Sequence, residues 1–307
     1  MTSQADNRTG GGFMPWLRLA LLVASLFSAP ALAAEVSLHH VHGLAYSSDG
    51  KKLFVPSHYG LAVYEGGKWS KAAGPEHDYM GFAVTKDAFY SSGHPAPGSG
   101  LKNPFGLIRS RDQGKTWDSL GLMGEADFHQ MAAGWASNTV YVHNSHPNSR
   151  MPQRGIYVTG NSGIIWRHAA ARGLAGELIA LAPHPTRAEI VAAATRSGLY
   201  LSRDRGESFS ALVTGRVVTA ATFALDGAHL WFASHAGAAR HERLDWNKPS
   251  ADTVALPAFE ARDAVGYIAQ NPARPDEWAI ASFGRDVYVS RDRGKTWNTI
   301  ARRGATK

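Results

Sequence analysis

Histidines dominate the residues of this chain whose side chains could carry chemistry. The sequence contains 14 histidines and no cysteine. His40 and His42 lie two positions apart, so on an extended strand both imidazoles point to the same side and could chelate one ion. Neutral imidazole is a common ligand of zinc and copper, and carboxylates such as Asp78 and Asp127 can complete a site or orient its rings. These residue types indicate a transition-metal site, provided that the fold gathers histidines from distant parts of the chain.

A motif that recurs four times, each time after an apolar segment, indicates the elements that would position these histidines. Its pattern is Ser/Thr-x-Asp-x-Gly-x-Thr/Ser-Trp, with Asn161, Ile165 and Phe209 as departures, and the copies are residues 110–117, 159–166, 202–209 and 290–297. The carboxylate can accept hydrogen bonds from turn N–H groups, and the glycine permits a positive φ, so each copy predicts a tight turn between two strands. We therefore interpret Asp112, Asp204 and Asp292 as structural residues and not as catalytic acids.

The spacing of the repeats predicts the fold. The motif turn joins the third and fourth strands of a four-stranded unit, and units recur about every 40–50 residues, the length of a propeller blade. Each unit has an aromatic residue at the start of its fourth strand: Trp69, Trp117, Trp166, Phe209, Trp246 and Trp297. The sequence thus predicts an all-β domain over residues 34–307, a six-bladed β-propeller of four-stranded antiparallel blades. The alternative is seven blades, with one hidden at a terminus.

This topology sorts the histidines onto one face. Strands alternate in direction within a blade, so the turns between second and third strands share a face with the crossings between blades. Ten of the 14 histidines fall at those positions. First strands line the central channel, which places residues at their starts in its mouth. We predict a site for copper or zinc, or for a small ligand, at this mouth. Its metal ligands would be His40, His42, His77, His94 and His129, with His58 and His143 as outer candidates.

The repeated motif resembles the Asp-box, or BNR repeat, of sialidases, sortilin-type propellers and photosystem-assembly propellers. The chain also resembles small bacterial secreted proteins described as glycosyl-hydrolase-like or sialidase-like. The stretches that carry this similarity are residues 40–44, 74–78, 92–95 and 125–129. The resemblance covers nearly the whole chain after the first 33 residues. It implies a β-propeller, and Asp-boxes themselves occur on propellers with many functions.

A sialidase-like glycoside hydrolase is the second interpretation, and it rests on this resemblance. Sialidases place an arginine cluster, a Tyr–Glu pair and an Asp on the same face. Here Arg216, Arg262 and Arg285 would bind a substrate carboxylate, with Glu76 and Asp78 as further ligand-binding candidates. Glu125 and Asp127 would serve as acid and base. The chain departs from sialidases at residues 39–42, which stand where those enzymes have Phe-Arg-Ile-Pro, and whether it is an enzyme stays open.

A non-catalytic propeller that holds a protein partner or acts in assembly is the third interpretation, because sortilin-like and assembly-factor propellers use the same scaffold. The chain carries a formal net charge of +7. This charge favours acidic partners, but no run of Lys and Arg and no basic aromatic stripe indicates a nucleic acid.

The first 33 residues are predicted to be a cleavable signal peptide. Arg8 and Arg18 lie in or near a basic segment, the apolar run 19–27 follows, and Ala31-Leu32-Ala33 provides small residues for cleavage. The run is too short for a stable membrane anchor. We therefore expect a periplasmic or secreted protein with no membrane span after cleavage. Without cysteine it has no disulfides, so its core and its strand ladders must stabilise it.

Overall fold

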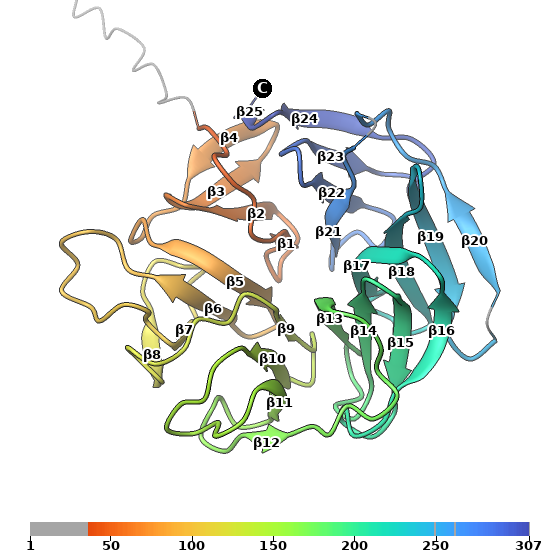
Figure 1. Ribbon diagram of the computed structural model, residues 1–307. Helices are drawn as coiled ribbons and strands as arrows, with labels where there is room; N and C mark the ends of the chain where they lie inside the picture. Colours follow the sequence, from red (N-terminus) through yellow and green to blue (C-terminus); the bar gives the residue numbers. More distant parts are fainter. Residues whose placement is uncertain (1–35, 249, 261, 307) are drawn as a thin grey trace, which may run out of the picture. The chain divides into compact units, whose positions relative to one another are not determined.

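The computed structural model describes residues 36–248, 250–260 and 262–306. These residues form six antiparallel sheets that surround a central channel, and each sheet is one blade of a six-bladed β-propeller (Figure 1). The prediction of six blades is therefore confirmed. The predicted signal peptide, residues 1–33, lies outside the described residues. The described part of the chain contains no helix that is long and apolar enough to cross a membrane.

The strands occur in chain order from the channel outwards within every blade. The innermost strands, which surround the channel in Figure 1, are β1 (Ala45–Tyr46), β5 (Asp78–Val84), β9 (Met131–Ala133), β13 (Leu178–Pro183), β17 (Val217–Phe223) and β21 (Val265–Gln270). The second strands are β2 (Lys52–Ser57), β6 (Phe89–His94), β10 (Val140–Asn144), β14 (Val191–Thr195), β18 (His229–His235) and β22 (Trp278–Ser282).

The outer two strands of each blade are joined by the turn that the motif occupies in four blades. The third strands are β3 (Gly60–Glu65), β7 (Leu107–Ser110), β11 (Gly155–Thr159), β15 (Gly198–Ser202), β19 (Ala239–Asp245) and β23 (Val287–Ser290). The fourth strands are β4 (Lys68–Lys71), β8 (Asp118–Gly121), β12 (Arg167–His168), β16 (Ser210–Thr214), β20 (Ala251–Val254) and β24 (Asn298–Arg302).

The ring is closed by both ends of the described chain. The sixth blade has a fifth strand, β25 (Ala305–Thr306), which pairs with β24. Ser37 forms a bridge with Ala305, and the Leu38 N–H donates to the Gly304 carbonyl at 2.8 Å. The sixth blade therefore completes its own four strands, and the N-terminal segment adds to its outer edge.

The apolar core consists of six clusters, each lying between two neighbouring blades. Between the fifth and sixth blades, Trp231 stacks on Trp278 with ring centroids 4.0 Å apart, and Trp278 is fully buried. The Trp297 indole N–H donates to the Ala255 carbonyl of the preceding blade. The aromatic residues that the repeat places near the fourth strands thus pack between blades, where their burial stabilises the ring.

The motif turns are built by the side chains that the sequence pattern repeats. In the fourth blade, Asp204 accepts hydrogen bonds from the Ser202 hydroxyl at 2.7 Å and from the N–H and hydroxyl of Ser208 at 2.9 and 2.5 Å. Ser202 in turn accepts from the Gly206 N–H, and Arg205 and Gly206 both have positive φ. Asp112 and Asp292 make the same set of bonds, whereas Asn161 accepts from a hydroxyl and one N–H.

The motif turn of the fourth blade also braces the preceding blade. The Gly206 carbonyl accepts from the Ala171 N–H at 2.9 Å, and the Glu207 carbonyl accepts from the Arg172 N–H at 3.0 Å. Residues 171 and 172 follow the last strand of the third blade. The turn therefore joins two blades at the outer rim, away from the inner strands that line the channel.

We expect Asp204→Ala to lower the free energy of unfolding by about 1–2 kcal/mol, because three hydrogen bonds at the turn are lost. Ligand binding at the channel should be unchanged. Thermal unfolding measures the first effect and metal titration the second. Asp226→Ala is a matched control, since Asp226 is a turn aspartate that accepts from a single N–H, that of Ala228. A loss of metal binding in Asp204→Ala without a loss of stability would contradict the structural role.

Candidate metal site at the channel mouth

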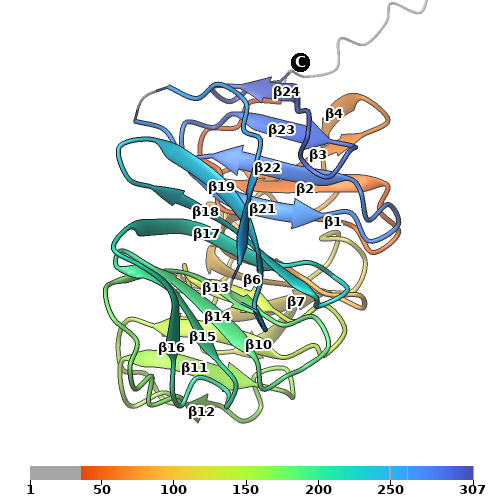
Figure 2. The ribbon, with the colours of Figure 1, turned by 90° about the vertical axis from the view of Figure 1, so that its right-hand side faces the viewer.

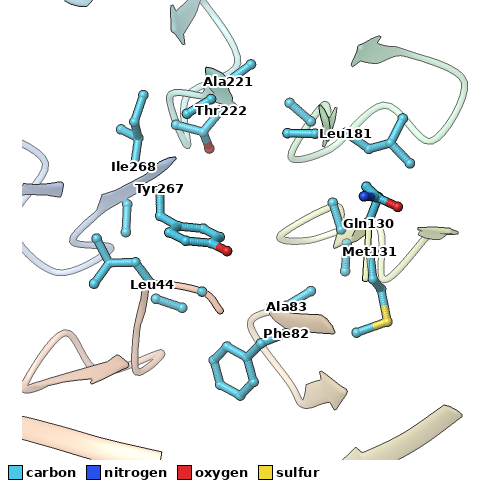
Figure 3. A pocket seen from close by; sticks show the side chains of 18 of the residues that line it. Leu44, Phe82, Ala83, Gln130, Met131, Leu181, Ala221, Thr222, Tyr267 and Ile268 are labelled. Atoms are coloured by element: carbon cyan, nitrogen blue, oxygen red, sulfur yellow. The ribbon is translucent and has the colours of Figure 1, made fainter. Parts of the chain in front are cut away.

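The channel holds a cavity of about 450 Å³ that is lined by residues of the inner strands. Its walls combine polar and apolar surface, and Leu44, Phe82, Met131 and Ile268 are among the apolar side chains that surround it (Figure 3). The Tyr267 hydroxyl points into this space, as Figure 3 shows. His42 and His129 also line the cavity, so the predicted mouth and the channel belong to one continuous site.

The first histidine group consists of His40, His42 and His58, all from the first blade. His40 and His42 lie in the segment before β1, and His58 lies in the turn between β2 and β3. The His42 N–H donates to the Pro56 carbonyl at 3.0 Å, which holds this segment against the end of β2. Each residue offers one ring nitrogen, and these three atoms lie within 4.8 Å of one another. Three imidazoles at this separation can bind one metal ion.

Asp78 orients the first histidine group from the neighbouring blade. Its Oδ2 atom accepts from His58 Nδ1 at 2.7 Å, so His58 Nε2 faces His40 Nδ1 at 2.9 Å. Its Oδ1 atom lies 3.6 Å from His42 Nε2. Both of these atoms are buried, and neither has a hydrogen-bond partner among the described residues. Buried polar atoms are rarely left without a partner. A cation bound by His42 Nε2, with the Asp78 carboxylate beside it, would provide one for both atoms.

The charge state of His42 also suits metal binding. Burial lowers the pKa of His42 to about 4, although the nearby Asp78 carboxylate acts in the opposite direction. The imidazole is therefore neutral at pH 7, which is the form that ligates metals.

The second histidine group consists of His94, Asp127 and His129, and it lies where the second and third blades meet. Asp127 Oδ2 lies 2.7 Å from His129 Nε2 and 3.2 Å from His94 Nε2. Their ligating atoms also lie within 4.8 Å of one another. His94 Nδ1 donates to the side-chain oxygen of Asn103 at 2.7 Å. The hydrogen bond to Asp127 raises the pKa of His129, so this imidazole carries positive charge more readily than an isolated one.

The two groups are neighbours because β5 and β6 hold them together. Asp78 is the first residue of β5 and lies directly opposite His94, the last residue of β6. The third blade is brought close by Gly81 in β5: a Cβ atom there would lie 2.0 Å from the Phe128 carbonyl oxygen. Only glycine permits this approach of the segment that carries Asp127 and His129. The groups therefore form one band across three blades, over the entrance of the channel.

Two of the predicted metal ligands, His77 and His143, belong to neither group. His77 is buried between Tyr79 and Phe105, and its Nδ1 accepts from the Ala96 N–H at 2.9 Å. Burial lowers its pKa. His143 lines a separate groove with Arg154, next to Asp127 and His129. The structure thus brings together His40, His42, His58, His94 and His129, and it gives His77 a packing contact instead.

The acids predicted from the sequence are also divided. Asp78 and Asp127 each contact two histidines, as described above. Glu76 pairs with Lys71 at 2.7 Å on the surface, and Glu125 accepts from the Ser149 N–H at 2.8 Å. Asp127 is therefore held by the histidines, while Glu125 anchors the loop between β10 and β11.

The three arginines predicted to bind a carboxylate have separate surroundings. Arg216 pairs with Glu242 at 2.8 Å, and both side chains are largely buried. Arg285 has a φ of 69° and donates to the His39 carbonyl at 3.1 Å. Arg262 is exposed.

Asn103 and Tyr267 are site residues that the sequence reasoning did not assign. Asn103 lies in the long connection between β6 and β7, and nothing in its local pattern distinguishes it from the other polar residues there. Tyr267 occupies an inner strand, where alternation alone would have placed it toward the channel or toward the neighbouring blade. Burial raises the pKa of Tyr267 to about 12, so its hydroxyl remains a donor at neutral pH.

Comparisons with known proteins establish the fold. No protein-family model and no curated protein matches the chain. Among solved structures, a GH74 enzyme from Niastella koreensis superimposes with a TM-score of 0.61 at 15% identity, covering 87% of this chain and 46% of the enzyme. An ancestral GH74 enzyme gives 0.52 at 12% identity, covering 87% and 39%.

YCF48 bound to a D1 peptide is a third similar structure, with a TM-score of 0.51 at 15% identity, covering 87% of this chain and 82% of YCF48. The chain thus spans less than half the length of the two GH74 enzymes and most of the length of YCF48. At these identities the likeness defines the class of fold, a β-propeller, and function must be argued from the site.

Proposed function

We propose that this protein binds a transition-metal ion, copper or zinc, through His40, His42 and His58 at the mouth of its channel. The observation that carries the proposal is the convergence of three ring nitrogens within 4.8 Å, with Asp78 bonded to one of the rings. Nitrogen-only ligand sets suit zinc and copper better than magnesium or calcium, which prefer oxygen.

The surrounding residues support a site that keeps an accessible position. His40 is exposed and His42 lines the cavity, so an ion held between them would face both solvent and the channel. A bound zinc ion in a three-histidine site supplies a Lewis acid and lowers the pKa of its water to about 7. The Tyr267 hydroxyl and the mixed polar and apolar wall of the channel would then contact a small ligand that enters the channel.

We further propose that the protein is an exported Asp-box propeller, in the periplasm or secreted. This rests on the predicted signal peptide and on the four motif turns, whose repeated hydrogen bonds agree with the Asp-box pattern. An exported metal-binding protein without cysteine would depend on imidazole and carboxylate ligands, which matches the composition of the mouth.

Glycoside hydrolysis and protein binding have less support from the site. GH74 enzymes and peptide-bound YCF48 share the fold, but their sequence identity to this chain is too low to transfer a function. A carboxylate-binding cluster would need Arg216, Arg262 and Arg285 to converge, and Arg216 is instead neutralised by Glu242. For Asp127 to act as an acid or base, its contacts with His129 and His94 would first have to break.

The test is metal content by mass spectrometry on the purified chain, carrying no added histidine tag, beside a His40→Ala/His42→Ala variant. We expect the copper or zinc content to fall by about one equivalent in the variant, because two of three ligands are lost. A His146→Ala/His229→Ala variant is the matched control, since both residues lie outside the two groups and do not line the channel cavity. Equal metal content in all three proteins would refute the site. No metal after loading would refute metal binding and leave sugar and peptide ligands to be screened.

A further inference from the structure

We propose that the second histidine group, His94, Asp127 and His129, holds a second transition-metal ion beside the first. This inference deepens the proposed function and rests on it: the channel mouth would be a two-metal centre. The ligand set of two imidazoles and one carboxylate suits a divalent ion such as zinc, cobalt or iron(II).

The arrangement of acceptors in this group points to a cation. The Asn103 oxygen accepts from His94 Nδ1, which leaves the lone pair of His94 Nε2 directed at Asp127 Oδ2, 3.2 Å away. In the neutral ring these two atoms are both acceptors and repel, so the contact favours a cation between them, either a proton on Nε2 or a metal ion. The other carboxylate oxygen, Asp127 Oδ1, is buried and has no hydrogen-bond partner among the described residues. A metal ion at this place would satisfy both atoms.

The supporting contacts resemble those of a metal site and not those of a surface ion pair. His94 is oriented by Asn103 through the nitrogen remote from Asp127, the relation that metal-bound histidines commonly have with an outer amide or carboxylate. The Asp127 side chain is only 19% exposed, although it lies at the mouth of a channel. The Phe128 N–H donates to the Ser92 hydroxyl at 2.9 Å, which fixes the backbone between Asp127 and His129. The carboxylate is therefore held in place by the fold.

The two proposed ions would have separate ligands in a common band. The first group belongs to one blade, and the second is shared by the next two. Asp78, which orients the first group, and His94, which belongs to the second, are directly opposite on β5 and β6. His42 and His129, one from each group, line the same cavity. A ligand in the channel would thus be within reach of both groups.

The experiment is zinc stoichiometry of the purified full chain without an added tag, stripped with a chelator and titrated with zinc chloride by calorimetry. We expect about two equivalents for the natural chain and about one for His94→Ala/His129→Ala and for His40→Ala/His58→Ala. The control His146→Ala/His229→Ala, which removes the same number of imidazoles elsewhere, should keep about two. Asp127→Asn preserves the shape of the side chain and removes its charge, so this variant should also bind only about one equivalent of zinc. It provides the test if His94→Ala/His129→Ala does not fold.

The possible results separate this inference from the proposed function. A single equivalent that is lost only in His40→Ala/His58→Ala would overturn the second ion and leave the first. A single equivalent lost in both double variants would mean one shared ion and would also overturn it. A single equivalent lost only in His94→Ala/His129→Ala would support metal binding by this group and refute the site of the proposed function. An absence of zinc binding would refute both.

Discussion

Asp78→Asn is expected to weaken metal binding at the first histidine group by about 10- to 100-fold, the usual cost of losing an outer carboxylate. The asparagine oxygen can still accept from His58 Nδ1, so the ring keeps its orientation. The substitution removes the negative charge of the carboxylate. Its oxygens lie 2.7 Å from His58 Nδ1 and 3.6 Å from His42 Nε2, where the charge favours a bound cation. Calorimetric titration with zinc or copper measures the affinity directly.

A matched control for this substitution is Asp276→Asn. Asp276 pairs with Arg293 at 2.7 Å on the surface and contacts neither histidine group. We expect its metal affinity to equal that of the natural chain, and we expect both variants to unfold at nearly the same temperature. If Asp78→Asn bound metal as tightly as Asp276→Asn, Asp78 would not belong to the site.

His241→Phe is expected to reduce the loss of stability that the protein shows in acid. His241 lies in β19, fully buried between Trp231 and Trp297, with ring centroids 5.4 and 6.1 Å away. Neither ring nitrogen has a hydrogen-bond partner among the described residues. Burial lowers the pKa of His241 to about 3, because the charged form cannot be solvated there.

The sign of the pH dependence follows from this shift. The unfolded chain binds a proton at His241 near the ordinary pKa of 6.5, whereas the folded chain does so only near pH 3. The unfolded state therefore binds more protons between these values, and the free energy of unfolding falls as the pH drops from 6.5 towards 3. At pH 5 this one residue would cost about 2 kcal/mol relative to pH 7.

Denaturant unfolding at pH 7 and pH 5 tests the prediction. The difference in unfolding free energy between these values should be smaller by about 2 kcal/mol in His241→Phe than in the natural chain. His241→Leu should show the same change, which separates loss of the titrating ring from the packing of a larger one. His146→Phe, at an exposed position, should keep the natural pH dependence. If His241→Phe changed the unfolding free energy by the same amount at both pH values, the effect would come from packing alone and the prediction would be wrong.

Much of the fold follows from local chemistry in the sequence. The Ser/Thr and Asp of the motif close their own turns, and the recurring aromatic residues pack between blades, so a period of about 40–50 residues was enough to predict six four-stranded blades. The contacts that close the ring could not be predicted in the same way. The pairing of Ser37 with Ala305 joins opposite ends of the described chain, and no local pattern specifies such a contact.

The sequence predicted which residues lie near the candidate site, but not which of their side chains meet there. Strand order places the ends of inner strands at the mouth, and this brought His40, His42, His58, His94 and His129 into the prediction together with Asp78 and Asp127. The same rule included His77, which packs instead against Tyr79 and Phe105. Topology assigns a residue to an end of a strand, but it does not determine the direction of its side chain.

The sequence by itself therefore determined the class of fold, the number of blades and the histidine-rich face, because these depend on repeated local turns and on the alternation of strand direction. Only the tertiary structure decided which histidines meet. The division into two groups depends on the register of β5 against β6, on the close approach that Gly81 allows, and on partners such as Asn103. These are contacts between blades and loops distant in sequence, whose geometry is set by packing over the whole ring.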